Sequence, residues 1–399
     1  MASLVVRSRA RLFHGHCWVY GTEVAHVHGE PAPGDVVRLI DQRNRPLGSA
    51  IFNPQSQIVA RRFSFRRQDL DADFFVRRIT RAWQYRQQLA SSAAPNAAGI
   101  DPRLCRVVWS ESDGLPGLIV DRYDDALVVQ TLTRAMDDRK PLITAALNEV
   151  LAPRVIVERN DSPIRKAEGM DPAVTGILSG EGATVIEWPA PPVTLRIDLL
   201  DGQKTGLYLD QLTNHRAVAA LAPGARVLDA FCHQGGFALA CAAAGAASVD
   251  AIDSSQPAVD AGSAAAGDAG LDIRWHVRNA FDALKEFEKR GDQFDLIVLD
   301  PPSFTKGKGS LQSALRGYKE LHLRALKMLA AGGRLATFSC SHHVGWQELR
   351  DIAAAAAVDA RRSVRLRQTL GQRADHPIDL AIPETEYLRG LVLEVTASW

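Results

Sequence analysis

The chain has 399 residues, of which 46% are hydrophobic and 23% are charged, and its formal net charge is +1. This composition excludes a disordered or fibrous chain, and the length predicts two or three globular domains. No uninterrupted apolar run is long enough to span a membrane, and the opening residues MASL lack the regions of a signal peptide, so we expect a cytoplasmic protein with no membrane partner.

The first 70 residues predict a small β-barrel. Short apolar runs at residues 36–40, 51–52 and 58–63 alternate with turn signals, at a spacing too short for strand–helix–strand units. Residues 1–85 also carry 13 arginines against 7 acidic residues. This excess on a nearly neutral protein predicts that the N-terminal module binds a polyanion.

Residues 71–195 predict a linker helix followed by a small α+β domain. The apolar pattern is helical over residues 74–89 and then gives way to short runs typical of strands. Within this domain we expect strands near residues 106–109, 117–121, 127–131 and 154–158 and a helix near residues 139–150.

From about residue 224 the pattern becomes strand, glycine-rich turn and alanine-rich helix, repeated along the chain. This pattern is typical of a doubly wound parallel sheet, so residues 196–399 predict an α/β, Rossmann-like domain. Ligands bind such sheets in the crevice outside the carboxyl ends of the strands. The residues at those strand ends are therefore the candidates for chemistry.

The first strand of this domain ends at Asp229 and is followed by a glycine turn, in the sequence RVLDAFCHQGGF at residues 226–237. Gly235 and Gly236 are expected to let the backbone approach a ligand where a helix begins. The turn matches neither the three-glycine pattern of dinucleotide-binding folds nor a P-loop, which argues against a phosphate-binding site.

The next two strand ends supply groups that suit a nucleoside. Asp253 can accept hydrogen bonds from both hydroxyls of a ribose, as an acid on the second strand does in Rossmann sheets. Asn279 and Phe281 follow the third strand, where an amide can pair with adenine and a ring can stack on it. A glycine turn, a ribose acid and an adenine pocket in this order predict S-adenosylmethionine as the cofactor.

A fourth strand ends at Asp300, within FDLIVLDPPSF at residues 294–304. Pro301 and Pro302 fix an extended backbone that holds this acid at the sheet edge, where it can accept a hydrogen bond from the exocyclic amino group of a base. Asp-Pro-Pro followed by an aromatic residue is typical of amino-nitrogen methyltransferases, but here a serine comes before Phe304. That departure weakens the amino-nitrogen interpretation.

Cys340 lies where another apolar strand ends, in GGRLATFSCSHHV at residues 332–344, which a pair of glycines opens as a turn. Cytosine C5 accepts a methyl group after a thiolate has added to C6, so a cysteine near Asp300 predicts covalent methylation of cytosine. His342 or His343 can favour the thiolate. The five cysteines form no Cys-x-x-Cys pair, and a cysteine two residues from one histidine is poor metal spacing, so we predict no metal site.

Together these features resemble the large-subunit rRNA cytosine-C5 methyltransferases of bacteria and archaea that carry an N-terminal PUA domain. The resemblance covers essentially the whole chain and is carried by residues 15–20 (GHCWVY), 53–56 (NPQS), 202–211 (GQKTGLYLDQ), 231–237 (FCHQGGF), 300–304 (DPPSF), 316–319 (RGYK), 338–341 (FSCS) and 374–377 (ADHP).

The resemblance implies a PUA-like barrel, an α+β middle domain and a class I methyltransferase domain. It implies Cys340 as the nucleophile and an extended segment from Lys204 to Gln211 that lines the cofactor cleft. Phe231 of the glycine turn is a further predicted cofactor-binding residue. The implied partner is the rRNA of the large ribosomal subunit or its precursor, and many members are homodimers. The chain departs from the family at His233 and Gln234, where an aromatic and a hydroxyl residue are usual.

Three functions stay open at this point. The first is methylation of cytosine C5 in large-subunit rRNA. The second is methylation of an exocyclic amino group in RNA by the Asp-Pro-Pro sequence at residues 300–302, without the thiol. The third is an RNA-binding ribosome assembly factor without catalysis, against which the intact set of Asp229, Asp253, Asp300 and Cys340 argues.

Overall fold

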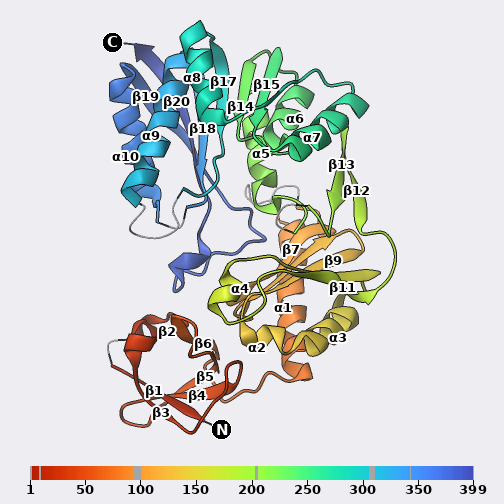
Figure 1. Ribbon diagram of the computed structural model, residues 1–399, viewed down its shortest axis with the longest axis vertical. Coiled ribbons are helices and arrows are strands. Elements are labelled where there is room, and N and C mark those ends of the chain that lie inside the picture. Colours follow the sequence, from red (N-terminus) through yellow and green to blue (C-terminus); the bar gives the residue numbers. More distant parts are fainter. Residues whose placement is uncertain are drawn as a thin grey trace. The chain divides into compact units, whose positions relative to one another are not determined.

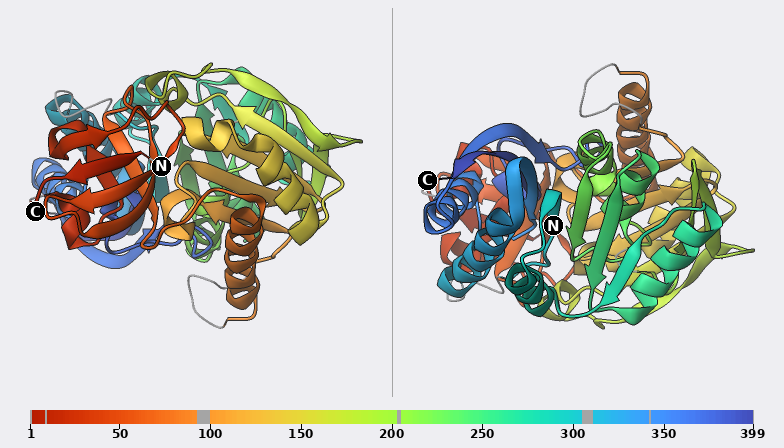
Figure 2. Two further views of the ribbon diagram at one scale, coloured as in Figure 1. Left: turned by 90° about the horizontal axis from the view of Figure 1, so that it is seen from below. Right: turned by 90° about the horizontal axis from the view of Figure 1, so that it is seen from above.

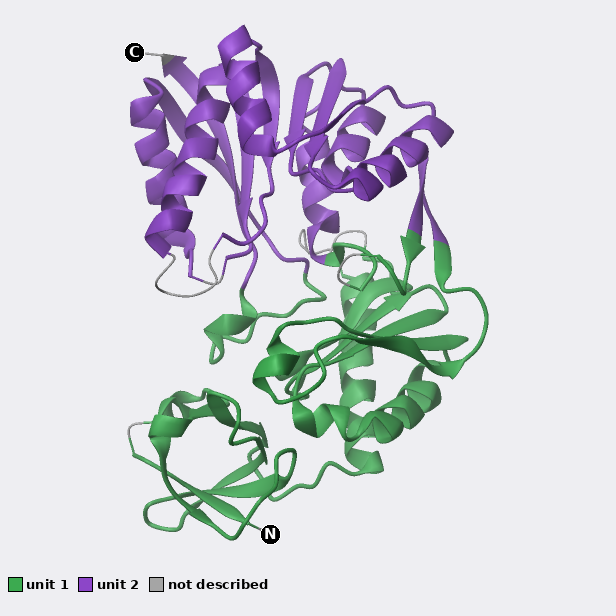
Figure 3. Ribbon diagram, in the orientation of Figure 1, with its two compact units in different colours: residues 1–186, 197–209, 374–386 green, residues 187–196, 210–373, 387–399 purple. Residues whose placement is uncertain are grey.

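The computed structural model describes residues 2–8, 10–92, 100–202, 205–304, 311–341 and 343–398. The chain divides into two compact units (Figure 3). Unit 1 consists of residues 1–186, 197–209 and 374–386, and unit 2 consists of residues 187–196, 210–373 and 387–399. Residues 374–386 thus pack in unit 1, although we expected them within the C-terminal domain. The domain boundaries predicted at residues 70 and 195 stay predictions.

Unit 1 begins with the expected barrel. Its strands are β1 (Ser3–Val6), β2 (Trp18–Tyr20), β3 (Val24–His28), β4 (Val36–Asp41), β5 (Pro46–Phe52) and β6 (Ile58–Ser64). They form one sheet in the order β2-β6-β5-β4-β1-β3, which curls round on itself (Figure 1). Apolar and charged residues alternate along β4, which suits a strand in the wall of a barrel. Val37 and Leu39 are fully buried inside it, while Arg38 between them is exposed.

The second part of unit 1 is a five-stranded sheet in the order β11-β10-β9-β8-β7. Its strands are β7 (Leu104–Trp109), β8 (Leu118–Tyr123), β9 (Ala126–Thr131), β10 (Val155–Asn160) and β11 (Val174–Gly180), with helices α1 (Ala72–Ala90), α2 (Arg134–Asp137), α3 (Lys140–Leu151) and α4 (Ile164–Ala167). The aromatic and aliphatic face of α1, with Phe74, Phe75 and Ile79, belongs to the core of this sheet. The elements expected between residues 74 and 158 are therefore confirmed.

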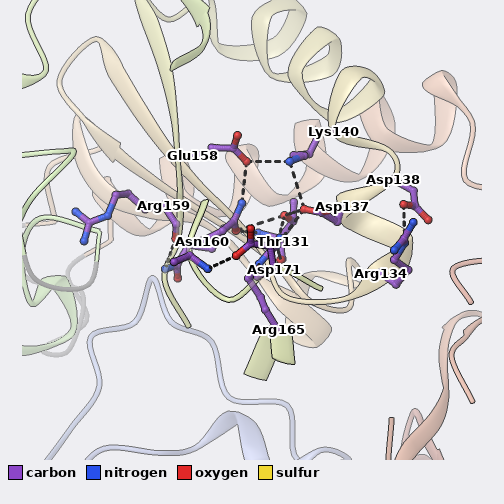
Figure 4. A network of polar contacts seen from close by, with 12 residues as sticks. Thr131, Arg134, Asp137, Asp138, Lys140, Glu158, Arg159, Asn160, Arg165 and Asp171 are labelled. Carbon is purple, nitrogen blue, oxygen red and sulfur yellow. Dashed lines mark hydrogen bonds and ion pairs between the residues drawn. The ribbon is translucent and has the colours of Figure 1, made fainter. Parts of the chain in front are cut away.

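A network of buried and half-buried polar side chains closes the ends of β9 and β10 (Figure 4). Arg165, which is 1% exposed, donates to the Thr131 carbonyl at 2.5 Å and to Asp137 Oδ1 at 2.9 Å. Lys140 Nζ donates to Glu158 Oε2 at 3.0 Å. Each of these cations meets a carboxylate, which is the condition under which buried charge is tolerated. The network ties α4 to the sheet.

Unit 2 contains the expected doubly wound sheet. Its strands are β14 (Arg226–Ala230), β15 (Ser248–Asp253), β16 (Arg274–Val277), β17 (Phe294–Leu299), β18 (Leu329–Ser339), β19 (Arg362–Gly371) and β20 (Arg389–Ser398), and its helices are α5 (Leu212–Ala219), α6 (Gly236–Ala243), α7 (Gln256–Asp268), α8 (Ala280–Arg290), α9 (Leu311–Met328) and α10 (Trp346–Asp359). The order is β16-β15-β14-β17-β18-β20-β19, and β20 runs antiparallel to both of its neighbours, β18 and β19.

Helices cover both faces of this sheet (Figures 1 and 2). Helices α8, α9 and α10 contribute to one hydrophobic cluster and helices α5 and α6 to another. The strand order reverses between β14 and β17, which are paired in parallel. In open α/β sheets, the crevice at the carboxyl ends of such strands is where ligands bind.

One local detail differs from the expected elements. Gly332 and Gly333 do not precede the strand that leads to Cys340 but lie inside β18, where the register with β17 shifts. The strands β12 (Val185–Ala190) and β13 (Val193–Asp198) form a two-stranded sheet in which the bond between Pro191 and Pro192 is cis. Within the described residues, no helix combines the length and apolarity that crossing a bilayer requires.

Candidate active site at the carboxyl edge of the parallel sheet

Three acids meet at the carboxyl edge of the sheet in unit 2. Asp229 lies in β14, Asp253 is the last residue of β15, and Asp300 follows β17 directly. The three strands are parallel, and β14 lies between the other two, so their ends lie side by side. The charges of both Asp300 and Asp253 act on Asp229. The structure therefore brings these three acids together at the reversal of strand order.

Asp229 is fully buried, and its Oδ1 has no hydrogen-bond partner among the described residues. Its Oδ2 accepts from the Ala238 N–H at 2.9 Å. Burial raises the pKa of Asp229 to about 8 against the effect of this hydrogen bond, and the charges of Asp300 and Asp253 raise it further. A buried acceptor without a donor fits a ligand that brings a positive charge, as S-adenosylmethionine does.

The turn between β14 and α6 packs tightly against protein side chains. Phe231 and Gly235 have positive φ angles of 66° and 77°. A Cβ atom at Gly235 would lie 2.4 Å from Cη2 of Trp275, and one at Gly236 would lie 2.4 Å from Cε1 of His215. We expected both glycines to make room for a ligand. The contacts with Trp275 and His215 are already enough to require glycine at both positions, whether or not a ligand binds there. Cofactor binding by the two glycines stays a prediction.

Asp253 and Asn279 both serve the local backbone. Asp253 Oδ2 accepts from the His233 N–H at 2.9 Å, and its Oδ1 accepts from the Ser255 N–H at 2.8 Å, which joins the end of β15 to the glycine turn. Asn279 caps α8, because its Oδ1 accepts from the Phe281 N–H at 2.9 Å. Both carboxylate oxygens of Asp253 keep a second lone pair for a ribose, and Asn279 keeps its amide nitrogen for a base.

A row of aromatic rings lies beside the acids. The Phe281 ring centroid is 6.1 Å from that of Phe231 and 5.9 Å from that of Phe304. Phe304 in turn lies 4.9 Å from Tyr318 of α9. The three phenylalanines are only partly buried where they pack against the core. They give the edge an apolar surface of the kind on which flat rings stack.

Asp300 is held by an amide pair from the start of α5. Gln211 Nε2 donates to Asp300 Oδ2 at 2.9 Å, and Asn214 Nδ2 donates to Gln211 Oε1 at 2.6 Å. Asn214 Nδ2 also donates to the Gly371 carbonyl at 3.0 Å. A backbone carbonyl only accepts, so this last contact sets the orientation of both amides and directs an N–H at Asp300. Lys204, the other predicted residue of this segment, lies outside the described residues.

Cys340 follows the last residue of β18, the strand beside β17. The two strands are parallel with Leu299 opposite Thr337, so Asp300 and Cys340 leave the same edge of the sheet from neighbouring strands. Cys340 is half-buried and the other four cysteines are buried, and none of the five is in a disulfide. His343 is half-buried, and His342 lies outside the described residues.

Two residues of the site were missed by the sequence analysis. Asn214 lies one helical turn after Gln211. This spacing places both side chains on one face of the helix, and it is the feature of the sequence from which their contact could have been predicted. Tyr318 was noted only as part of the sequence RGYK, although it is fully buried and its hydroxyl lies in the field of both Cys340 and Asp300. Neither has a role that sequence spacing alone reveals.

Comparison with known proteins finds a family for two parts of the chain. Residues 7–65 match a model of the PUA-like domain, and residues 164–371 match a model of S-adenosylmethionine-dependent methyltransferases. The chain is 38% identical to "Ribosomal RNA large subunit methyltransferase I" of Aeromonas hydrophila, over 98% of each chain. It is 36% identical to the protein of the same name from Alteromonas mediterranea, over 96% of this chain and 95% of that one.

Among solved structures, the chain is similar to one from Streptococcus mutans that is described as a SAM-dependent methyltransferase. The TM-score is 0.83 at 20% sequence identity, over 99% of this chain and 100% of that one. At this identity the likeness concerns the fold, and it extends over the barrel, the middle sheet and the doubly wound sheet alike.

Proposed function

The chain belongs to the S-adenosylmethionine-dependent methyltransferase family whose members include the ribosomal RNA large subunit methyltransferases I, and from this we propose that it methylates C5 of a cytosine in large-subunit rRNA. The names of the relatives support large-subunit rRNA as the substrate, and the PUA-like domain supports RNA binding. The observation that carries the C5 chemistry is the half-buried thiol of Cys340, which leaves the sheet beside the strand that ends at Asp300.

In the proposed reaction, Cys340 activates the base. Its thiolate adds to C6 of cytosine and forms a carbon–sulfur bond, and the displaced electron pair makes C5 nucleophilic. S-adenosylmethionine supplies a methyl group on a sulfonium, which leaves as a neutral thioether when C5 takes the methyl carbon. A base then removes the C5 proton, and that electron pair restores the C5–C6 double bond as the thiolate leaves. The thiol is regenerated without any oxidant or reductant.

Asp300 orients the base in this proposal. Gln211 donates a hydrogen bond to Asp300 Oδ2, and the Asp300 carboxylate accepts a second hydrogen bond from the exocyclic amino group of the cytosine. Asn214 fixes Gln211 through its contact with the Gly371 carbonyl, so Asp300 meets an N–H donor from Gln211. Because a carboxylate oxygen accepts more than one hydrogen bond, Asp300 can also accept from the base. This arrangement distinguishes cytosine, which presents an amino group, from uracil, which presents a carbonyl.

The proposed product is tested with rRNA that carries tritium at C5 of its cytidines. Methylation of C5 should release one tritium for each methyl group transferred, and nucleoside chromatography with mass spectrometry should find 5-methylcytidine. Methyl transfer without tritium release, with N4-methylcytidine as the product, would instead establish the exocyclic-amino reaction. If the protein binds RNA but transfers no methyl group, either to naked rRNA or to subunit precursors, the non-catalytic assembly factor is the better interpretation.

The cofactor affinity is expected to rise with pH between about 6 and 8. Asp229 has a pKa raised to about 8 by burial, so it is mostly protonated at pH 6 and must lose its proton to meet a cation. Well below that pKa the affinity should rise on the order of tenfold per pH unit, and it should level off above pH 8. In the free protein the same pKa shift makes the free energy of unfolding depend on pH. The contribution of Asp229 to stability is full below its ordinary pKa of 3.8 and is lost as the pH rises to about 8, because the buried carboxyl must then ionise.

Calorimetry in two buffers of different ionisation enthalpy measures both the affinity and the protons released on binding. Asp229→Asn should bind more weakly at pH 8, release no proton and lose the pH dependence. Asp250→Asn is the control, because Asp250 lies in β15 away from its carboxyl end and pairs with Arg274. A wild-type affinity that stays constant from pH 6 to 8 would mean that Asp229 does not meet the positive charge.

A further inference from the structure

The hydroxyl of Tyr318 connects α9 to the two neighbours of Cys340. Tyr318 is fully buried, and so are Ser339 and Ser341 on either side of the thiol. The Ser339 hydroxyl donates to Tyr318 Oη at 3.0 Å, and Tyr318 Oη lies 3.1 Å from Ser341 Oγ. One phenol therefore grips the residues before and after the half-buried cysteine.

The direction of these hydrogen bonds follows from the protons available. Ser339 Oγ accepts from the Ser341 N–H at 3.3 Å and donates its own proton to Tyr318. The single proton of Tyr318 is then left for Ser341 Oγ, which lies 3.2 Å from Ser303 Oγ. The chain of hydroxyls thus runs from Ser339 to Tyr318 on α9 and back to Ser341, which contacts Ser303 in the loop that follows Asp300.

The ring and the hydroxyl of Tyr318 have separate contacts. Its ring packs on Phe304 with centroids 4.9 Å apart, which holds the loop after Asp300 from the apolar side. Burial raises the pKa of the hydroxyl to about 12, partly offset by its serine hydrogen bonds, and the charges of Cys340 and Asp300 raise it further. The phenol therefore stays neutral, and able to donate, over the pH range in which a thiol titrates.

We propose that Tyr318 is the positioning residue of the nucleophile, because its hydroxyl fixes the Ser339–Cys340–Ser341 loop against the loop of Asp300 and so directs the Cys340 thiol at the bound base. This inference rests on the proposed function, in which Cys340 attacks C6. Tyr318 touches neither base nor cofactor in this role. It acts through the two serines, and the distance between nucleophile and base orienter depends on it.

The test is Tyr318→Phe in the full chain, which removes the hydroxyl and keeps the ring. We expect kcat to fall at least tenfold, with little change in the KM for RNA or in the affinity for S-adenosylmethionine. Alkylation of Cys340 by iodoacetamide, followed by peptide mass spectrometry, should become several-fold faster because the loop is no longer held. Cys232 and Cys241 are buried and should stay unlabelled, which shows that the domain has not opened.

Thr337→Val is the matched control. Thr337 is equally buried in β18, and its Oγ1 lies 2.7 Å from Nε2 of His322 on the same helix as Tyr318, one turn further along. This variant loses a buried hydrogen bond between the same two elements but leaves the thiol loop intact. It should show the loss of stability without the fall in kcat or the faster alkylation.

Two outcomes separate this inference from the proposed function. If Tyr318→Phe and Thr337→Val behave alike in kcat and in alkylation of Cys340, Tyr318 is a core residue and the inference is wrong. If Cys340→Ala methylates RNA as well as the wild type, the proposed function fails, whatever the alkylation rates are. Slower turnover and faster alkylation together, in Tyr318→Phe alone, support the positioning role.

Discussion

Cys340→Ala is expected to lose methyl transfer almost completely while it binds S-adenosylmethionine and RNA much like the wild type. The proposed mechanism depends on a thiolate that adds to C6, and a serine hydroxyl or a carboxylate does not replace it as a nucleophile near neutral pH. Removing the nucleophile of a serine protease lowers kcat on the order of 10⁶-fold, and we expect a loss of several orders of magnitude here. Single-turnover transfer of a labelled methyl group to rRNA measures the loss directly.

Cys241→Ala is the control for this variant, since Cys241 is a fully buried thiol on the core-facing side of α6 and should keep turnover close to that of the wild type. RNA with 5-fluorocytosine at the target adds a second readout, because fluorine cannot leave as a proton does and the adduct is trapped. Wild-type protein should form a covalent complex that survives denaturation, and Cys340→Ala should form none. An adduct on Cys340→Ala would move the nucleophile elsewhere, with Cys232 as the next candidate.

The edge of the proposed site could be predicted from the sequence because each of its acids comes at or near the end of a short apolar run. Asp229, Asp253 and Asp300 lie at or next to the ends of strands that the βα rhythm identifies as parallel, and parallel neighbours place their carboxyl ends together. The same reasoning located Cys340 after β18. In these cases the information is local, since the apolar residues at the end of a strand and the residue beside them suffice.

The supporting contacts could not be found in this way because they join distant parts of the chain. Asn214 reaches the Gly371 carbonyl, 157 residues away, and Tyr318 reaches Ser339 and Ser341 across 21 and 23 residues. Local patterns of hydrophobicity do not encode such pairs. They become visible when the fold brings the elements together.

Two other features are not encoded in local patterns. A glycine needed next to a ligand and a glycine needed next to Trp275 look the same in a sequence, so the pattern around Gly235 predicts a ligand contact without revealing this packing contact. Residues 374–386 follow the strands of unit 2 but pack in unit 1, where Asp375 accepts from the Arg106 N–H at 2.9 Å across 269 residues. Position along the chain does not reveal this packing.

Asp300→Asn is expected to weaken methylation of cytosine and to shift the preference toward uracil. Asn214 holds Gln211 with its N–H directed at position 300, so the new amide must turn its oxygen to Gln211 and its NH₂ group to the base. The NH₂ group then faces the amino group of cytosine, donor against donor, but suits the carbonyl of uracil. Loss of one well-placed polar contact of this kind lowers kcat/KM on the order of 10²–10³-fold.

Matched RNAs with cytidine or uridine at the target position measure this change, through the yields of 5-methylcytidine and 5-methyluridine. Asp250→Asn again serves as the control that should leave both yields as they are. The sharper arm is the double variant Asp300→Asn with Asn214→Ala. Without Asn214, Gln211 can turn its oxygen toward the new amide, which then presents its own oxygen to the base, so cytosine methylation should partly return. A double variant no better than Asp300→Asn, or a single variant with unchanged base preference, would show that position 300 does not read the amino group.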